Sequence, residues 1–325
     1  MFAEFYGLTA LPFQLTPDSR FFFDSSGHSK ALAHLTYGLQ QGDGFIVITG
    51  DVGTGKTMLV EHLWSQLDTD DYVAARISST QLSPTGFLRM MASAFGLSYQ
   101  GSDKTRLLRE LAAFFDANYA AGKRTLMVVD EVQNLPFATL EELRMLSNLT
   151  VGHHASLQNF LLGQPQFRSM LASRDAEQLR QRVFTSYHLG PLSEPEVRKY
   201  IEHRLQVVGW SGDPAFDDAA FTTIYKYTGG TPRKINLLCS RLLLWGFLEG
   251  EHVIGVRQVE DVAVDWVSEL EPQQYLSGTK QTSISNLKPD LVPRIENIER
   301  RLARHDIALQ RALDALTHFA PTAAE

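Results

Sequence analysis

The sequence predicts an α/β fold, in which helices flank a parallel sheet, followed by an all-α unit and a C-terminal heptad helix. Three observations support this prediction. Short β-type apolar runs alternate with helical patterns before residue 192, which is typical of a parallel sheet. Four successive helical patterns then follow one another. Apolar residues at alternating spacings of three and four finally mark a heptad pattern after residue 293.

Composition restricts the class of protein before any motif is considered. A chain of 325 residues suggests about two domains at roughly 150 residues each, and 44% hydrophobic residues are enough for a sizeable core. The net charge of −7 is opposite in sign to that of most proteins that coat nucleic acids. Cys239 is the single cysteine, which excludes an intramolecular disulfide and a cysteine-based zinc site. We expect a mildly acidic cytoplasmic protein with neither a secretory signal nor a membrane span.

Five short apolar runs predict the strands of the sheet. The first spans Phe45 to Thr49 and ends at Gly50. Helical periodicity lies between the runs, for example at Leu107, Leu111 and Phe115. The other four runs are residues 72–77, 125–129, 159–162 and 186–189.

Helix-start and turn residues divide the second half of the chain. Ser193, Asp213-Pro214, Thr231-Pro232 and a turn at Gly255 each precede a helical pattern. A polar stretch with Pro, Gly and little periodicity then predicts a linker. The expected organisation is a core over 1–191, a helical unit over 192–269, a linker over 270–293 and a heptad helix over 294–319.

The heptad pattern spans about four repeats, and His305 is its weak position. Two interpretations stay open: an amphipathic helix that docks on its own protein, and a coiled coil that self-associates or binds a partner. The seam residues are Ile295, Ile298, Leu302, His305, Leu309, Ala312, Leu316 and Phe319.

Residues 50–57 match the phosphate-loop pattern G-x-x-x-x-G-K-[ST] in full. The match follows a β-type run and opens a helical segment, which is the context that this loop requires. Glycines let successive backbone N–H groups face a polyphosphate, the lysine neutralises the β- and γ-phosphates, and the hydroxyl ligates Mg²⁺. We expect ATP and Mg²⁺ as ligands of a site that comprises Gly50, Asp51, Val52, Gly53, Thr54, Gly55, Lys56, Thr57 and Met58.

The apolar run over residues 125–129 is followed by two adjacent carboxylates, Asp130 and Glu131, at the carboxyl edge of the predicted sheet. Asp130 is expected to hold Mg²⁺ together with Thr57, as the aspartate does in other phosphate-loop enzymes. Glu131 is expected to act as the general base for the attacking water.

The order of these motifs resembles the AAA+ superfamily and, more closely, general secretion pathway protein A-type ATPases. Within these it is most similar to the secretion ATPase of exosortase (PEP-CTERM) and exopolysaccharide loci. The resemblance covers residues 1–268 and implies a nucleotide-binding core with a helical lid. It is carried by the blocks PFQLTPDSRFFF, GFIVITGDVGTGKT, VVDEVQNL, ELRMLSNL, FLLGQPQF, LRQRV, YHLGPL and GGTPRKIN.

The resemblance also implies roles for single residues. Gln164 takes the place of the sensor that orients the attacking water, although other AAA+ proteins more often carry Asn, Ser or Thr there. Arg182 matches the arginine that reaches the nucleotide of a neighbouring subunit, with Arg180 as the competing candidate. Arg233 matches the lid arginine of the second sensor. Phe13, Pro17 and His28 match the adenine-side wall, although Phe13 also fits an apolar cap over the sheet edge.

The function expected from the sequence is ATP hydrolysis that energises or regulates an envelope secretion or exopolysaccharide-protein export system. Its partners are expected to be further copies of the chain and export proteins, reached through the heptad helix. Those partners would hold it at the inner membrane of a bacterium. Two alternatives stay open: a DNA-associated AAA+ ATPase of the transposition target-selection type, which the net charge of −7 disfavours, and a nucleotide-gated scaffold with little turnover.

Overall fold

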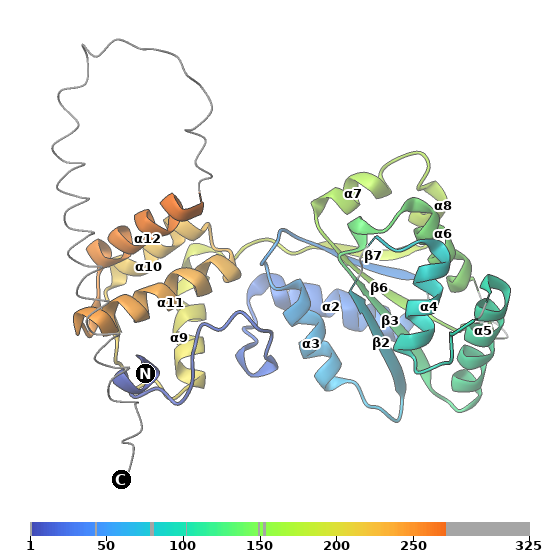
Figure 1. Cartoon of the computed structure of the whole chain (residues 1–325), viewed down its shortest axis with the longest axis horizontal. Helices are drawn as coiled ribbons and strands as arrows, with labels where there is room; N and C mark the ends of the chain where they lie inside the picture. Colours follow the sequence, from blue (N-terminus) through green and yellow to red (C-terminus); the bar gives the residue numbers. More distant parts are fainter. Residues whose placement is uncertain are drawn as a thin grey trace, which may run out of the picture.

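The structure is a computed structural model that describes residues 2–42, 44–78, 81–101, 103–148, 150–151 and 154–270. A sheet with flanking helices forms one part of the molecule, and helices α9 to α12 gather in a second part beside it (Figure 1). The predicted heptad helix and the predicted linker, apart from Leu270, lie outside the described residues. Within the described ranges, no helix combines the length and the hydropathy needed to cross a bilayer.

The central sheet has five strands in the order β2-β3-β6-β1-β7, and every neighbouring pair is parallel. This confirms the predicted α/β class with a parallel sheet. Since the strands run in one direction, their carboxyl ends meet at a single edge. The strands are β1 (Phe45–Thr49), β2 (Tyr72–Ser78), β3 (Arg124–Asp130), β6 (Gln158–Gly163) and β7 (Val183–His188).

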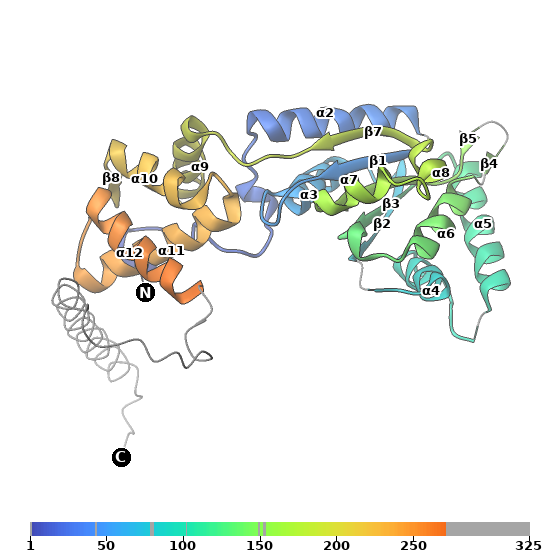
Figure 2. The same cartoon turned by 90° about the horizontal axis from the view of Figure 1, so that it is seen from above.

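Side chains alternate between the two faces of the sheet, and a separate apolar cluster covers each face. Ile46 and Ile48 of β1 pack toward α2 and α3, whereas Phe45 and Val47 pack toward the opposite helices. Helix α2 lies alongside β1 and β7 (Figure 2). One face carries α2 (Ser26–Gln41) and α3 (Lys56–Gln66), and the other carries α4 (Pro84–Ala94), α5 (Lys104–Ala120), α6 (Phe137–Ser147), α7 (Pro165–Leu171) and α8 (Glu177–Arg180).

Several of these helices are preceded by a residue whose side chain accepts a hydrogen bond from a backbone N–H group of the first turn. Ser25 accepts a hydrogen bond from the His28 N–H at the start of α2. Asp103 does the same for the Arg106 N–H at the start of α5. Such caps stabilise a helix by about 1 kcal/mol. The described chain also contains the short elements α1 (Phe2–Phe5), η1 (Ser19–Phe21), η2 (Val132–Asn134), β4 (Thr150–Val151) and β5 (His154–Ala155).

Four helices form the lid, and three of them begin where the sequence predicts. Ser193 and Thr231 precede α9 and α11, and Gly255 precedes α12. The remaining helix, α10, begins at Asp218 rather than directly after Asp213-Pro214. The residues before it form a two-residue parallel ladder between β8 (Ala215–Phe216) and β9 (Val253–Ile254), which the sequence pattern does not predict. The lid is therefore not purely helical. Its helices are α9 (Glu194–Val207), α10 (Asp218–Thr228), α11 (Pro232–Glu249) and α12 (Val256–Leu270).

The N-terminal segment packs with the lid rather than with the sheet. Tyr6, Phe13 and Phe21 are buried in the same apolar cluster as the lid helices, and both ribbon views draw the N-terminus beside them. The Tyr6 hydroxyl donates to the Leu243 carbonyl oxygen over 3.2 Å. A division into 1–191 and 192–269 stays a proposal, and the first 21 residues share the core of the lid.

Cys239 is buried in that core, as its apolar sequence context predicts.

Helix α2 packs so closely against β1 that there is no space for a side chain at Gly38. A Cβ atom added at Gly38 would overlap the buried Ile46 side chain, whereas one at Gly27 of the same helix would make an ordinary 3.5 Å contact with Leu189. We expect Gly38→Ala to lower the free energy of unfolding by about 1–3 kcal/mol. Gly27→Ala should leave it unchanged or raise it by up to about 1 kcal/mol. Urea unfolding of both variants measures the difference, and equal midpoints would contradict this account.

Candidate functional site

The loop between β1 and α3 has the conformation that its glycines permit. Gly53 and Gly55 adopt φ angles of +85° and +100°, which non-glycine residues rarely adopt. A Cβ atom at Gly55 would lie 2.7 Å from Nε2 of the buried His28. The loop therefore needs glycine at these two positions, and of the two the phosphate-loop pattern specifies Gly55.

Lys56 lies at the start of α3 and is buried. Its ammonium donates to the carbonyl oxygens of Gly50, over 2.7 Å, and Asp51, over 3.0 Å. Burial lowers the pKa of Lys56, while Glu131 and other nearby carboxylates oppose that shift. The ammonium group thus lies inside the loop, where the phosphates of a bound nucleotide would offer it stronger acceptors.

Asp130 ends β3 and faces the first turn of α3. Its Oδ2 accepts a hydrogen bond from the Thr57 hydroxyl over 3.1 Å, and its Oδ1 accepts one from the Glu131 N–H over 2.9 Å. The structure therefore brings together Thr57 and Asp130, the two predicted metal ligands.

This pair of oxygen donors fits Mg²⁺. That ion takes one or two carboxylates together with substrate phosphates and water, rather than an all-protein cage. Among the residues that the structure describes, no group of three His, Cys, Asp or Glu side chains could hold a metal ion alone. A site completed by nucleotide phosphates agrees with both observations.

Glu131 has a backbone conformation that is unusual for its residue type. Its φ angle of 51° makes it the non-glycine residue with positive φ among the described residues, and such strain is concentrated at functional sites. Its Oε2 accepts hydrogen bonds from the side-chain amides of Gln133, over 2.5 Å, and Gln164, over 3.0 Å. Gln133 also accepts a bond from the Gln164 N–H over 3.0 Å. The predicted sensor Gln164 therefore contacts the predicted base.

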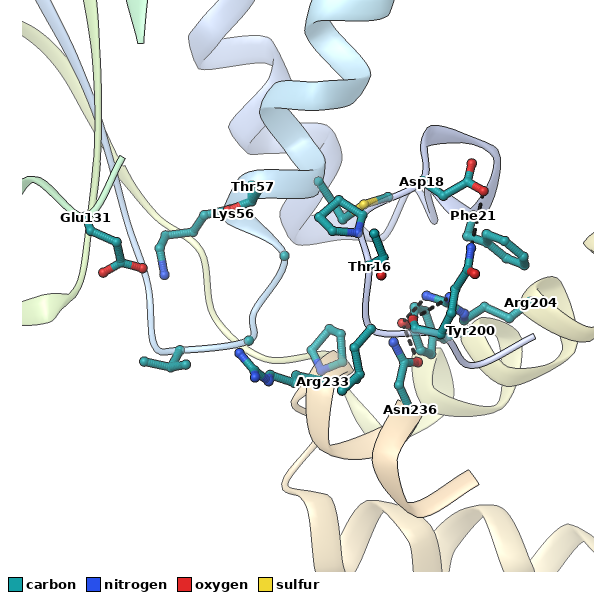
Figure 3. A pocket seen from close by; sticks show the side chains of 18 residues that line it. Thr16, Asp18, Phe21, Lys56, Thr57, Glu131, Tyr200, Arg204, Arg233 and Asn236 are labelled. Carbon is teal, nitrogen blue, oxygen red and sulfur yellow. Dashed lines mark hydrogen bonds between the residues drawn. The ribbon is translucent and has the colours of Figure 1, made fainter. Parts of the chain in front are cut away.

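A cavity of about 340 Å³ lies between the P-loop, the N-terminal segment and the lid. In Figure 3, Lys56 and Glu131 extend toward each other on one side of it, and Tyr200 and Asn236 lie on the lid side. The lining residues are Gln14, Leu15, Thr16, Pro17, Asp18, Phe21, Val52, Gly53, Gly55, Lys56, Thr57, Met58, Glu131, Tyr200, Arg204, Pro232, Arg233 and Asn236.

The lid meets the P-loop directly through the start of α11. The Arg233 N–H donates to the Gly53 carbonyl oxygen over 3.1 Å, and a Cβ atom at Gly53 would lie 2.5 Å from the Cβ of Arg233. The Arg233 side chain lines the cavity. This location agrees with the position expected for a lid arginine, whereas its action on a phosphate stays a prediction.

Comparison with known proteins identifies the part of the chain that contains the P-loop. The family model of the AAA domain matches residues 39–171, which contain the P-loop, Asp130, Glu131 and Gln164. This segment of the chain is therefore similar to an AAA domain. The chain is also similar to General secretion pathway protein A of Aeromonas hydrophila, with 41% identity over 255 residues that cover 78% of this chain and 46% of the relative. The chain thus spans less than half the length of this relative, and the predicted similarity to general secretion pathway protein A is confirmed.

Solved structures share the fold at low sequence identity. ORC2 of Aeropyrum pernix, from a structure of ADPNP–ADP complexes, has a TM-score of 0.58 at 14% identity and covers 77% of this chain and 72% of its own. Cdc6p from Pyrobaculum aerophilum has a TM-score of 0.59 at 16% identity, over 79% and 75% of the two chains. These similarities confirm the predicted fold, a phosphate-loop core followed by a lid.

A buried polar network joins the N-terminal segment to the lid, and no pattern in the sequence predicts it. Arg204 of α9 donates to the carbonyl oxygens of Pro12, over 2.6 Å, and Gln14, over 3.2 Å. It also donates to the Tyr200 hydroxyl over 3.0 Å, and that hydroxyl donates to Asn236 of α11 over 2.9 Å. The segment that lines one wall of the cavity is therefore held by lid residues.

The three residues that resemble an adenine-side wall lie in different places. Pro17 lines the cavity. Phe13 is instead buried in the lid cluster, in agreement with an apolar role. His28 lies beneath the P-loop, with Nδ1 2.7 Å from the Ser25 hydroxyl, and burial lowers its pKa. Phe13 is thus not among the residues that line the cavity, whereas His28 lines a smaller adjoining pocket of about 40 Å³ that shares Gly55 and Tyr200 with it.

A further contact links the AAA core to the lid beside the cavity. Glu196 of α9 accepts hydrogen bonds from the N–H groups of Ser193 and of Ser26, the first residue of α2. Burial alone would raise the pKa of Glu196, but these bonds and the Ser193 hydroxyl lower it to about 2. The carboxylate is therefore charged at neutral pH and connects the two parts at their junction.

The structure does not bring Arg182 or Arg180 to the P-loop of the same chain. Arg182 precedes β7, and its carbonyl oxygen accepts a hydrogen bond from the Phe45 N–H at the amino end of β1 over 2.8 Å. The P-loop follows the carboxyl end of β1, so the length of a strand separates them. Arg180 ends α8 and donates to the Leu171 carbonyl oxygen over 3.2 Å. The location of Arg182 is compatible with action on another subunit.

Proposed function

We propose that this AAA protein binds ATP with Mg²⁺, hydrolyses it, and uses the resulting lid movement to energise or regulate an envelope secretion system. The observation that carries the proposal is that Lys56, Thr57 and Glu131 line one side of the cavity and that Asp130 hydrogen-bonds to both Thr57 and Glu131. A water-activating carboxylate, a metal-binding pair and a phosphate-binding lysine are the parts that phosphoryl transfer requires.

The P-loop residues bind and orient the nucleotide in this proposal. Lys56 gives up its two carbonyl acceptors and binds the β- and γ-phosphates, and the loop N–H groups surround them. Thr57 and Asp130 would hold Mg²⁺, which supplies charge neutralisation at the phosphate oxygens. Arg233 reaches the γ-phosphate from the lid, so that the bound nucleotide joins lid and core.

Glu131 accepts the proton of the attacking water. The hydrogen bonds from Gln133 and Gln164 converge on its Oε2 and fix the orientation of the carboxylate. Gln133 and Gln164 therefore act as positioning residues for the base. A base held by two amides within a strained backbone is preorganised for in-line attack on the γ-phosphate.

Substitution of Lys56 and Glu131 separates binding from turnover. We expect Lys56→Ala to abolish ATP binding, because the buried positive charge at the phosphates is lost. Glu131→Gln should bind ATP normally and lose turnover by at least about a hundredfold, since the base is removed. Fluorescent-nucleotide binding and phosphate release measure the two effects, with Lys226→Ala, at an exposed position of α10, as the control. Robust hydrolysis by Lys56→Ala or full activity of Glu131→Gln would contradict these assignments.

Oligomerisation would complete the site with an arginine from a neighbour. A planar and permanently charged guanidinium suits the charge that develops on the γ-phosphoryl group. The location of Arg182 at the amino edge of the sheet supports action on a second copy of the chain rather than on its own nucleotide.

Mixing experiments test this arrangement. Arg182→Ala subunits retain a nucleotide site, and Lys56→Ala subunits retain the arginine, so each variant alone should be inactive. We expect the mixture to regain a measurable part of the wild-type turnover, because some sites combine both functional parts. Arg180→Ala serves as the matched control and should keep its activity alone. An active Arg182→Ala protein, or a mixture without recovery, would refute action between subunits.

The link to secretion rests on the similarity to General secretion pathway protein A, of which this chain spans 46%. We propose that the protein acts on the cytoplasmic side of the inner membrane of a bacterium. It would be held there by export-system proteins that bind the predicted heptad helix over 294–319. Within that class, we propose an exosortase (PEP-CTERM) or exopolysaccharide system.

Genetic complementation tests the pathway. We expect deletion of the gene to reduce surface or medium levels of the exported polysaccharide and its associated proteins. Wild-type protein should restore export, and the Glu131→Gln variant should not. Export that is unchanged by the deletion would contradict the proposal. Transposase genes beside this gene, in place of exosortase and polysaccharide-export genes, would favour the DNA-associated alternative.

A further inference from the structure

Arg76 of β2 forms an ion pair with the carboxylate that the proposed metal site uses. Its Nη2 lies 2.6 Å from Oδ2 of Asp130, which is almost fully buried. Its Nη1 lies 2.5 Å from Oε1 of Glu61 on α3. Arg76 itself is only 24% exposed and Glu61 43%, so the guanidinium joins a buried acceptor to a more exposed one.

The contacts of Asp130 leave little room for a further ligand. A carboxylate offers about four lone-pair positions. The Thr57 hydroxyl and Arg76 Nη2 use those of Oδ2, and the Glu131 N–H uses one on Oδ1. One position therefore remains for a metal ion or for its bound water while Arg76 is in place.

Charge leads to the same conclusion. Arginine stays protonated at all accessible pH values, so Arg76 compensates the negative charge of Asp130 at a distance of 2.6 Å. A divalent cation near Asp130 would meet repulsion from the guanidinium, and this repulsion is strong at a poorly hydrated position. Metal and guanidinium are consequently competitors for a single carboxylate.

We propose that Arg76 is a positioning residue that occupies Asp130 before nucleotide binds and competes there with the divalent metal ion. Glu61 is the acceptor that retains the guanidinium when the metal arrives. Since Glu61 lies on α3, the helix that begins at Lys56, this exchange is coupled to the P-loop. The inference rests on the proposed nucleotide function and adds a control over metal loading to that site.

The buried Nε of Arg76 agrees with an exchange between two acceptors. This donor has no hydrogen-bond partner within the described part of the chain, and a buried donor without a partner is energetically unfavourable. The pairing with Asp130 is therefore not the fully satisfied state of the guanidinium, and its release is correspondingly less costly.

Manganese binding measures the competition without reference to turnover. The full-length protein with saturating ADP is titrated with Mn²⁺, and free Mn²⁺ is followed by electron paramagnetic resonance. We expect Arg76→Gln to tighten Mn²⁺ binding about tenfold, because removal of one nearby positive charge has an effect of this order. Glu61→Gln should weaken it about threefold, because the guanidinium loses its second acceptor and stays on Asp130.

Opposite shifts distinguish this proposal from a purely structural role, in which both substitutions would weaken binding. ADP affinity in the presence of chelator verifies that each variant retains its fold. The matched control is Arg109→Gln, at an exposed position of α5. Unchanged or weaker Mn²⁺ binding in Arg76→Gln, with normal binding in the wild type, refutes the inference and leaves the proposed function intact. Failure of the wild type to bind Mn²⁺ with ADP refutes both.

Discussion

All five strands of the sheet run parallel, and the candidate site depends on this constraint. Three of them, β1, β3 and β6, end at one edge, where they deliver the P-loop, the Asp130–Glu131 pair and Gln164. The Thr57–Asp130 hydrogen bond then joins the start of α3 to the end of β3. Residues that are distant in the chain therefore become neighbours because of strand direction and order.

The lid adds a second set of contacts to that edge. Arg233 meets the backbone of Gly53, and Arg204 holds the N-terminal segment that lines the opposite wall. Neither the core nor the lid encloses the cavity alone. A ligand that bridges both parts would stabilise one arrangement of them, and in the proposed function nucleotide binding would be converted into movement in this way.

Local patterns were sufficient to predict much of this structure. The P-loop needs consecutive residues with defined chemistry, and Asp130 and Glu131 terminate a recognisable apolar strand. Gln133, Arg76, Tyr200 and Arg204 could not be found in this way, because each acts through a partner that sequence spacing does not reveal. The Gln in the VVDEVQNL block was visible, but nothing local indicated that its amide turns back to Glu131.

The sequence by itself determined the glycine-containing loop with its lysine, the α/β class and the presence of a helical second part, because hydrophobic period and glycine placement are local properties. Tertiary structure decided which groups the charged side chains of the site contact. It showed that Asp130 is paired with Arg76, that Glu131 is held by two amides, and that Arg182 lies a strand length from its own P-loop. These features follow from strand order and helix packing, which bring together groups that the linear sequence keeps apart.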